Sequence, residues 1–133
     1  MSIMKLLSHI AVAATFAFAA VAPAHAADFR DFDSNAFAAA QAAGEPVLVD
    51  VHAWWCPVCA SQSHTIKKLT ASPRYDKLVV FRLNYDKQKD DWKRLGVTTQ
   101  GTLIAYRGQT ETGRLAYQTN AAKIEAVLDS AVR

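Results

Sequence analysis

The sequence predicts an α/β domain in which a mixed β-sheet lies between helices. The near-continuous apolar run from Val47 to Ala53 suits a central strand covered on both faces, and it passes directly into a segment with helical spacing. A second strand follows from Leu78 to Asn84, and this strand–helix–strand order makes the pair parallel and right-handed. The segments Thr102–Tyr106 and Arg114–Gln118 flank Gly108–Gly113, which predicts an antiparallel hairpin with a loose loop.

Helices are expected wherever apolar residues recur with helical spacing between a capping residue and a breaker. Asp33 or Ser34 can cap the first helix, Gly96 closes the third, and Asn120 caps the last. The predicted helices are Asp33 to Ala43, the segment from the cysteines to Thr70, Lys89 to Leu95, and the segment that follows Asn120 through Val132.

Residues 1–26 have the pattern of a cleavable signal peptide. Lys5 is followed by an uncharged, alanine-rich stretch from Leu6 to Val21, and Ala24-His25-Ala26 has the small-x-small form of a signal-peptidase site. The alternative is an uncleaved membrane anchor, but the apolar stretch is short for a spanning helix and contains polar residues. We therefore expect cleavage after Ala26, a periplasmic protein with no membrane insertion after cleavage, and one domain over residues 27–133.

The charge of the chain is too small to indicate a nucleic-acid partner. The formal net charge is +3, and removal of Lys5 with the signal leaves +2. Short basic runs such as Lys67-Lys68 are more often solvated faces than binding patches. We expect a monomer that does not bind nucleic acid.

The only two cysteines lie where the apolar strand hands over to a helix, as Cys56-Pro57-Val58-Cys59. Amide groups at a helix N-terminus stabilise a thiolate, so Cys56 is the candidate nucleophile. Cys59, one turn on, could attack a mixed disulfide and release the reduced substrate. Pro57 suits the first helical turn, where a missing N–H costs nothing. A purely structural disulfide is a poor explanation, because so short a loop removes little denatured-state entropy.

These residues resemble the motif of the thioredoxin superfamily. VDVHAWWCPVC contains the family's buried Asp, its Trp before the first Cys and its CxxC, while LVVFRLNYD and GVTTQGTLIAYRG resemble later strands of the fold. Among subtypes, the chain is most similar to the C-terminal, periplasmic thioredoxin-like domain of DsbD. The resemblance implies a thioredoxin-like fold with a mixed central sheet flanked by helices, and a thiol:disulfide oxidoreductase active in electron transport. It also implies protein thiol and disulfide substrates, a membrane electron donor of the DsbD type, and no cofactor beyond the redox-active Cys56–Cys59 disulfide.

The resemblance assigns a role to Asp50, which in thioredoxins lies beneath the second cysteine and accepts its proton. Burial in an apolar strand would raise the pKa of this carboxyl towards a useful range. Arg82 falls where many thioredoxins have a Lys near this Asp. Because an Arg keeps its proton, a fixed ion pair and a lower pKa for Asp50 are the opposing expectation.

Two further side chains complete the expected surroundings of the thiols. His52 shares the strand parity of Asp50, and as a histidinium it would favour a thiolate, although a core histidine with a backbone partner is equally consistent. Trp55 matches the family's Trp beside the first sulfur, while Trp54 either is exposed for docking or covers the helix end.

Gly101 is the main departure from the family pattern. In thioredoxins the residue before the Thr that matches Thr102 is a cis-proline, which faces the active site and shapes the substrate groove. A cis bond before a non-proline costs about 2.5–4 kcal/mol, so a trans Gln100–Gly101 bond is the simpler expectation. The groove, and with it the range of substrates, should therefore differ from those of a general thioredoxin.

Metal binding is the main alternative function. Cys56, Cys59 and His64, with His52 nearby, offer soft ligands for copper or zinc, and loss of the proline would open space beside the sulfurs. Against this, His64 should point away from the sulfurs along the helix. A third hypothesis is a non-catalytic thioredoxin-like adaptor.

The residues around the cysteines predict a reducing or intermediate redox potential. Strong oxidants with a similar Cys-Pro-x-Cys motif have a histidine before the second cysteine, whereas this chain has Val58, which can neither donate a hydrogen bond nor carry charge. The helix N-terminus alone should stabilise the Cys56 thiolate only moderately.

Overall fold

The central strand β2 (Pro46–His52) organises the structure, a computed structural model that describes residues 17, 19–20 and 26–133. β2 pairs in parallel with β3 (Val79–Asn84) and antiparallel with β4 (Thr102–Arg107). The five-stranded sheet has the order β1-β3-β2-β4-β5, which confirms the predicted mixed sheet. The remaining elements are β1 (Asp28–Asp31), α1 (Ser34–Ala42), α2 (Pro57–Thr70), the 3-10 turn η1 (Pro73–Tyr75), α3 (Lys89–Arg94), β5 (Thr110–Ala116) and α4 (Ala121–Val132).

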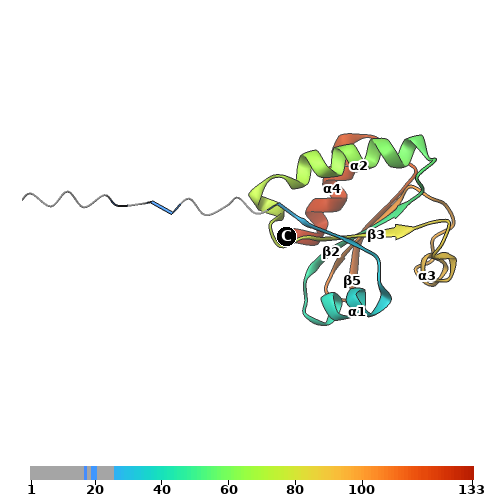
Figure 1. Ribbon diagram of the computed structural model, residues 1–133, viewed down its shortest axis with the longest axis horizontal. Helices are drawn as coiled ribbons and strands as arrows, with labels where there is room; N and C mark the ends of the chain where they lie inside the picture. The colour runs from blue at the N-terminus through green and yellow to red at the C-terminus, as the bar shows by residue number, and fades with distance from the viewer. Residues whose placement is uncertain (1–16, 18, 21–25) are drawn as a thin grey trace, which may run out of the picture.

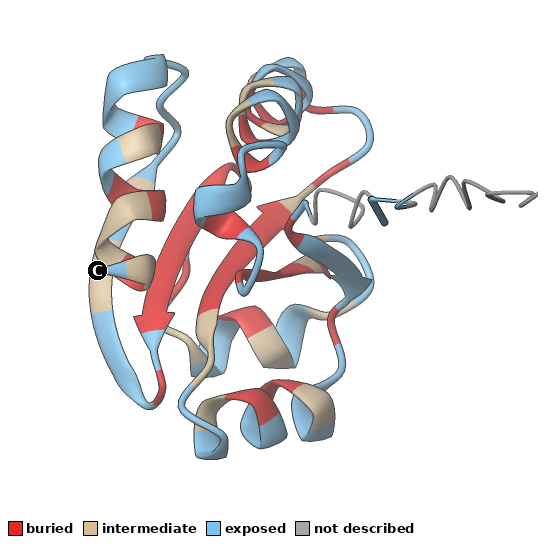
Figure 2. Ribbon diagram, turned by 90° about the vertical axis from the view of Figure 1, so that its left-hand side faces the viewer, coloured by how far each residue is buried: buried red, intermediate tan, exposed pale blue. Residues whose placement is uncertain are grey.

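Helices cover both faces of the sheet, with α2 and α4 on one side and α1 and α3 on the other (Figure 1). The alternation of side chains along β2 divides the core into two layers. Val49 packs with Phe37 of α1 and Trp92 of α3, whereas Leu48 packs with residues of α2 and α4 such as Ile66. The inner strands β2, β3 and β4 are the most completely buried part of the molecule (Figure 2), as the apolar run over residues 47–53 predicts for β2. Asp50 and His52 have the parity of Leu48 and therefore belong to the α2 side.

The helix limits agree with those predicted from capping residues. The Asp33 carboxylate accepts a hydrogen bond from the Ala36 amide over 2.8 Å and caps α1, and the Asn120 side chain caps α4 in the same way. Gly96 follows α3 with a φ of +70°, the left-handed conformation that ends many helices at a glycine.

One prediction about a strand was wrong, and one strand was missed. β5 begins at Thr110, not at Arg114, so Gly108 and Gln109 alone form the hairpin loop, which is tight and not loose. Gly108 has a φ of +57°, as such a short turn requires. The strand β1 was not predicted at all, because its four residues are all exposed and polar residues dominate it. It pairs in parallel with β3 at the edge of the sheet.

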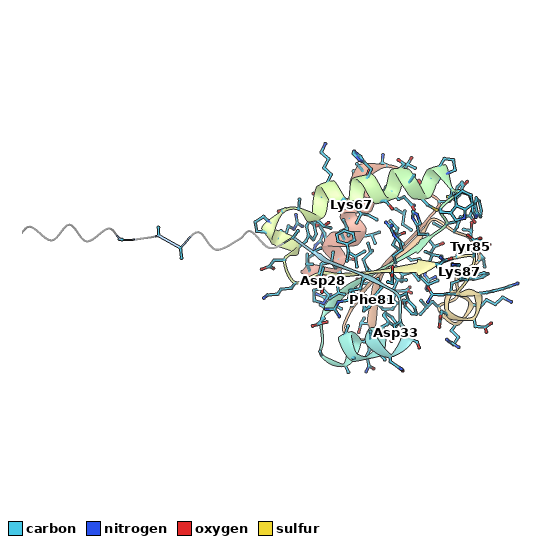
Figure 3. The ribbon with its side chains drawn as sticks, in the orientation of Figure 1. Asp28, Asp33, Lys67, Phe81, Tyr85 and Lys87 are labelled. Atoms are coloured by element: carbon cyan, nitrogen blue, oxygen red, sulfur yellow. The ribbon has the colours of Figure 1, made fainter. Side chains whose placement is uncertain are left out.

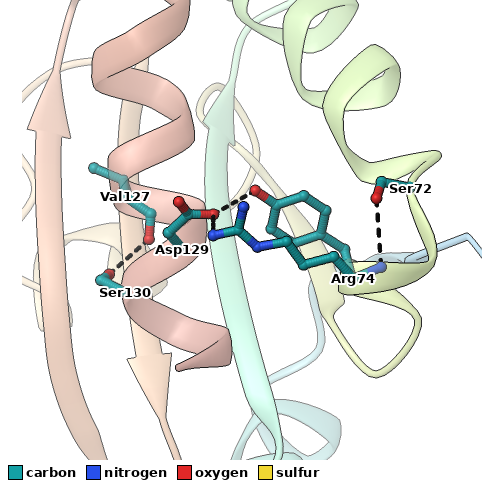
Figure 4. A network of polar contacts seen from close by, with 6 residues as sticks. Ser72, Arg74, Val127, Asp129 and Ser130 are labelled. Carbon is teal, nitrogen blue, oxygen red and sulfur yellow. Dashed lines mark hydrogen bonds and ion pairs between the residues drawn. The ribbon is translucent and has the colours of Figure 1, made fainter.

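The C-terminal end of α2 is fixed by contacts with distant segments. After α2, Tyr75 donates a hydrogen bond to Asp129 of α4 over 2.5 Å, and Arg74 forms an ion pair with the same carboxylate (Figure 4). The amide of Ala27 donates to the carbonyl oxygen of Thr70, the last residue of α2, over 3.2 Å. Ala27 is itself buried in the α2 and α4 layer. The domain therefore packs from its residue 27 onward.

The predicted signal peptide lies almost entirely outside the described residues, so cleavage after Ala26 stays a prediction. Within the described part of the chain, no helix combines the length and apolar character that crossing a bilayer requires.

Candidate active site

The two cysteines occupy the start of α2, directly beyond the central strand. Cys56 is the N-cap residue with an extended backbone, and Pro57 is the first helical residue. The Cys59 amide donates a hydrogen bond to the Cys56 sulfur over 3.1 Å, so this sulfur takes the place of the usual capping oxygen. Both cysteines are free thiols. The residues 53 to 56 form no strand or helix and place this pair at one end of the sheet.

The two thiols differ in chemistry more than in exposure. Cys56 is 2% exposed and Cys59 is fully buried, so the first sulfur is less open than its place at the helix start led us to expect. Burial, followed by the hydrogen bond with Cys56, raises the pKa of Cys59 to about 12. At neutral pH Cys59 is thus a thiol that needs a base before it can attack a disulfide.

Asp50 supplies a buried carboxylate beside this thiol. Its side chain is 2% exposed, and its charge is one of the influences that raise the pKa of Cys59. Arg82 is the neighbour of Asp50 in the β2–β3 register. Its Nε lies 3.7 Å from Asp50 Oδ2, which makes an ion pair but is too long for a good hydrogen bond. Among the described residues, Asp50 Oδ1 has no hydrogen-bond partner. Burial outweighs the attraction of Arg82 and raises the pKa of Asp50 to about 6. Arg82 lowers the pKa of Asp50, as expected, but the cost of burying the charge is the larger effect, so the net shift is upward.

Arg82 connects Asp50 to a polar network on the same face of the sheet. Its Nη2 donates to Ser63 Oγ over 2.9 Å, and Ser63 Oγ lies 3.4 Å from His52 Nδ1. Burial, then Arg82 and Lys67, lowers the pKa of His52 below its ordinary value. A permanent histidinium is thus disfavoured, and the partner of His52 is a serine side chain, not the expected backbone group.

A cavity of about 340 Å³ opens beside this network. Residues that line it include His52, Trp54, Arg82, Asn84, Lys87 and Gln88. It lies at the carboxyl ends of β2 and β3, and the labelled Tyr85 and Lys87 mark the end of the sheet where α2 begins (Figure 3). Solvent in the cavity can therefore reach the side chains of Arg82 and His52, although Asp50 itself is buried.

Aromatic side chains surround the start of α2. The indole N–H of Trp55 donates to the Asp86 carboxylate over 3.1–3.2 Å, and its ring packs edge-on against Tyr85. Tyr85 in turn stacks on Trp92 at a centroid distance of 4.9 Å. Trp54 is 85% exposed, so of its two predicted placements the structure shows the exposed one.

Gly101 lies beside the cysteine turn, in a backbone conformation that a proline cannot adopt. Its φ is +75°, its amide donates to the Val51 carbonyl over 2.8 Å, and no peptide bond between described residues is cis. A Cβ atom at this position would lie 3.5 Å from Val58 and 3.3 Å from the ring of Tyr117. The space that we expected the missing proline to leave open is therefore filled by other side chains. Thr102 is buried and fixes this loop by donating to the Thr99 carbonyl over 2.8 Å.

Sequence reasoning missed three polar or aromatic residues of this region. Gln62 and Ser63 lie one turn beyond Cys59, where polar residues on a helix usually face solvent, yet Gln62 is fully buried. Tyr117 follows a strand and gives no sequence signal of its left-handed conformation. The spacing from Cys59 to Gln62 and Ser63 was the one available signal, since positions three and four apart share a helix face.

The structure does not bring a set of metal ligands together. His64 is exposed on α2, and the described residues contain no group of three or more His, Cys, Asp or Glu side chains that could hold a metal ion. The metal-binding alternative is therefore not favoured.

A strand that delivers a Cys-x-x-Cys pair to the first turn of a helix defines the class of thiol–disulfide exchange proteins. Comparisons with known proteins agree. A family model described as Thioredoxin matches residues 29–130. A thioredoxin from Alicyclobacillus acidocaldarius subsp. acidocaldarius is 30% identical over 84 residues, which span 63% of this chain and 79% of that protein.

Solved structures show the same fold. Trxlp from Edwardsiella tarda EIB202 is 40% identical with a TM-score of 0.72, covering 80% of this chain and 100% of that one. The thioredoxin of Malassezia sympodialis is 16% identical with a TM-score of 0.70, covering 81% and 95% of the two chains, which shows the fold alone. The chain belongs to the thioredoxin family and is a thiol–disulfide oxidoreductase with a Cys56–Cys59 pair.

Proposed function

We propose that this protein is a periplasmic oxidoreductase that reduces protein disulfides, with Cys56 as nucleophile, Cys59 as resolving thiol and Asp50 as the base for Cys59. The observation that carries the assignment is the contrast between the two cysteines. Cys56 caps the helix and receives an amide hydrogen bond, whereas Cys59 is fully buried next to a carboxylate. A sulfur at the first position is electrostatically favoured as a thiolate.

The reaction transfers two electrons in two displacement steps. The Cys56 thiolate attacks one sulfur of the substrate disulfide, that S–S bond breaks, and the other substrate sulfur leaves as a thiolate. Cys59 then loses its proton to Asp50 and attacks Cys56 Sγ, which releases the second substrate sulfur. The substrate is reduced to two thiols, and the protein is left with a Cys56–Cys59 disulfide.

The first step prepares the second. Two of the influences that raise the pKa of Cys59 come from Cys56, through its hydrogen bond and its charge. Both are lost when the Cys56 sulfur becomes part of a neutral mixed disulfide, so the pKa of Cys59 falls at the moment when it has to react. Asp50, whose pKa is about 6, is largely ionised at pH 7 and can take the proton.

The remaining parts of the proposal concern the cellular setting. The signal-peptide pattern supports export, and Ala27, the residue after the predicted cleavage site, is the first of the described residues that is packed into the core. A disulfide-reducing protein in an oxidising compartment needs electrons, and the resemblance to the DsbD domain supports a membrane donor of that type. The cycle needs no redox group other than the cysteine pair, so we propose that no cofactor takes part. We also propose that the protein acts as a monomer.

The experiment that tests the function is reduction of insulin and of a small aromatic disulfide, with dithiothreitol as electron source. The reduced protein should accelerate both reactions, and an absence of exchange with either substrate would contradict the proposal. Fractionation of cells that express the full chain should recover the protein in the periplasmic fraction.

A further inference from the structure

Tyr117 is held in a conformation that tyrosine rarely adopts. Its φ is +55°, and it is the one residue other than glycine with a positive φ in the described chain. Such a conformation is unfavourable for tyrosine and persists only where the surroundings enforce it. Strain of this kind tends to occur at binding sites, and Tyr117 lies beside the cysteine turn.

The Tyr117 ring lies close to Gly101 and to the residue that precedes Cys59. A Cβ atom added to Gly101 would lie 3.3 Å from Tyr117 Cδ2 and 3.5 Å from Val58 Cγ1. The tyrosine ring and the residue before Cys59 therefore both lie close to Gly101. The residue is 51% exposed, so much of the ring is available to a partner. Tyr117 thus lies against Gly101, the position at which the family has its proline.

The buried side chain of Gln62 holds the loops on either side of the Tyr117 ring. It lies three residues after Cys59 on α2 and is fully buried. Its Nε2 donates to the carbonyl oxygens of Gly101 and Gln118, each over 2.9 Å, so one amide group ties together the two loops that flank the ring. The Tyr117 amide completes the connection by donating to the Gly101 carbonyl over 2.9 Å.

The arrangement is costly for stability alone. Gln62 Oε1 is buried without a hydrogen-bond partner among the described residues, which is unfavourable for stability. An apolar residue at this position would avoid that penalty, but it would leave the Gln118 carbonyl without its Gln62 donor and free the loop. Two adjoining unfavourable features, the strained tyrosine and the unpaired amide oxygen, point to a requirement for this particular geometry.

We propose that Tyr117 is a specificity-determining residue of the exchange site, where its ring contacts an apolar side chain next to the reacting cysteine of a polypeptide substrate. Gln62 is the positioning residue that fixes the ring. The inference rests on the proposed function and adds the substrate class: disulfides whose cysteines have apolar neighbours in the chain.

Two synthetic peptide disulfides test this, identical except that the residues flanking the cysteine are leucine in one and serine in the other. A small aromatic disulfide reports the thiol chemistry separately. The wild-type protein should reduce the leucine peptide with a KM about five-fold lower than that of the serine peptide, at similar kcat. Tyr117→Asn removes the ring while asparagine tolerates the left-handed conformation, so the KM for the leucine peptide should rise to that of the serine peptide and the preference should disappear. Tyr117→Phe keeps the ring and should keep the preference.

Gln62→Met keeps the volume at this position but removes both hydrogen bonds. It should weaken the preference for the leucine peptide through KM, with the serine peptide as the reference substrate. Thr70→Val is the matched control, since Thr70 is buried on the same helix and its hydroxyl bonds only to the Ile66 carbonyl. It should lower stability without altering the preference, and this variant together with Tyr117→Asn keeps the test decisive if Gln62→Met does not fold.

The outcomes separate this inference from the proposed function. A preference that survives in Tyr117→Asn, or that is absent in the wild-type protein, would overturn the role of Tyr117. Failure of the wild-type protein to react with the small disulfide as well would overturn the proposed function itself.

Discussion

The Cys59 amide donates a hydrogen bond to the Cys56 sulfur over 3.1 Å, within the first turn of α2. This bond distinguishes the two cysteines, because it favours a thiolate at Cys56 and leaves Cys59 a buried thiol. Cys56→Ser should therefore abolish disulfide exchange. Cys59→Ser should retain the first step and accumulate a mixed disulfide with insulin chains, visible as a shifted band on a non-reducing gel. Mixed disulfides that form in Cys56→Ser but not in Cys59→Ser would reverse the assigned roles.

Replacement of Asp50 should stabilise the protein at high pH. The pKa of this carboxyl is about 6 in the folded chain against a reference value of 3.8, so the folded state binds the proton more tightly. Stability is then lost as the pH rises from about 4 through 6. Asp50→Asn removes that loss and should raise the unfolding free energy at pH 8 by roughly 3 kcal/mol, with little difference at pH 4.

Urea unfolding at the two pH values checks this result, with Asp76→Asn as a control at an exposed carboxylate. The same Asp50→Asn variant should slow release of the mixed disulfide above pH 6 while leaving its formation unchanged. A gain in stability that is equal at both pH values would show that burial of the charge is not its cause.

Introduction of the family's proline at position 101 should fail to produce a general thioredoxin. Gly101→Pro would remove the amide that donates to Val51 and cannot reach a φ of +75° without rearrangement of the loop. We expect a loss of roughly 2–5 kcal/mol in unfolding free energy and no gain in insulin reduction. Gly44→Pro is the matched control, since Gly44 also has a positive φ and a donating amide but is exposed with open space around it. Equal losses in the two variants would contradict a special role for the contacts of Gly101.

The redox potential of the cysteine pair should lie between those of reductants and of intermediate carriers, roughly −270 to −180 mV. Val58 offers no hydrogen bond or charge to the Cys56 thiolate, and the lowered pKa of His52 leaves that residue mostly neutral. Val58→His should move the potential towards more oxidising values by tens of millivolts, because it stabilises the reduced form, while Val58→Leu should not. Equilibration with glutathione buffers measures both, and a wild-type value near −120 mV would contradict the argument.

Export should leave Ala27 as the first residue. Mass spectrometry of the protein purified from the periplasm should give the mass of residues 27–133. A replacement such as Ala26→Leu, at the predicted cleavage site, should cause the uncleaved precursor to accumulate. Recovery of full-length protein from the wild-type chain would contradict the signal-peptide prediction.

Local sequence signals were sufficient for most of the fold. The apolar run of β2, the cysteine pair and the caps Asp33 and Asn120 each act within a few residues, and the predicted elements around them were confirmed. The edge strand β1 gives no such signal, because it is held by backbone pairing with β3 and not by apolar side chains. The length of the hairpin loop was misjudged because the polar residues of β5 resemble those of a loop.

The parts of the site that sequence could not predict depend on tertiary distance. Gln62 is 39 residues from Gly101 in sequence, and only the folded chain places its amide between the two loops. The pKa of Asp50 depends on a balance between burial and Arg82 that residue types alone do not settle. The proposal that Cys56 is the nucleophile depends only on the order strand, cysteine, helix, and for this reason it could be made from the sequence.

The contact between Ala27 and Thr70 gives signal removal a further consequence. In the precursor, the Ala27 nitrogen that lies 3.2 Å from the Thr70 carbonyl oxygen is a neutral amide. Cleavage after Ala26 would make it an ammonium group, a full positive charge placed at the carboxyl end of α2, where the helix dipole is negative. The processed chain would then add a charge to the contact that fixes the carboxyl end of the helix of the two thiols.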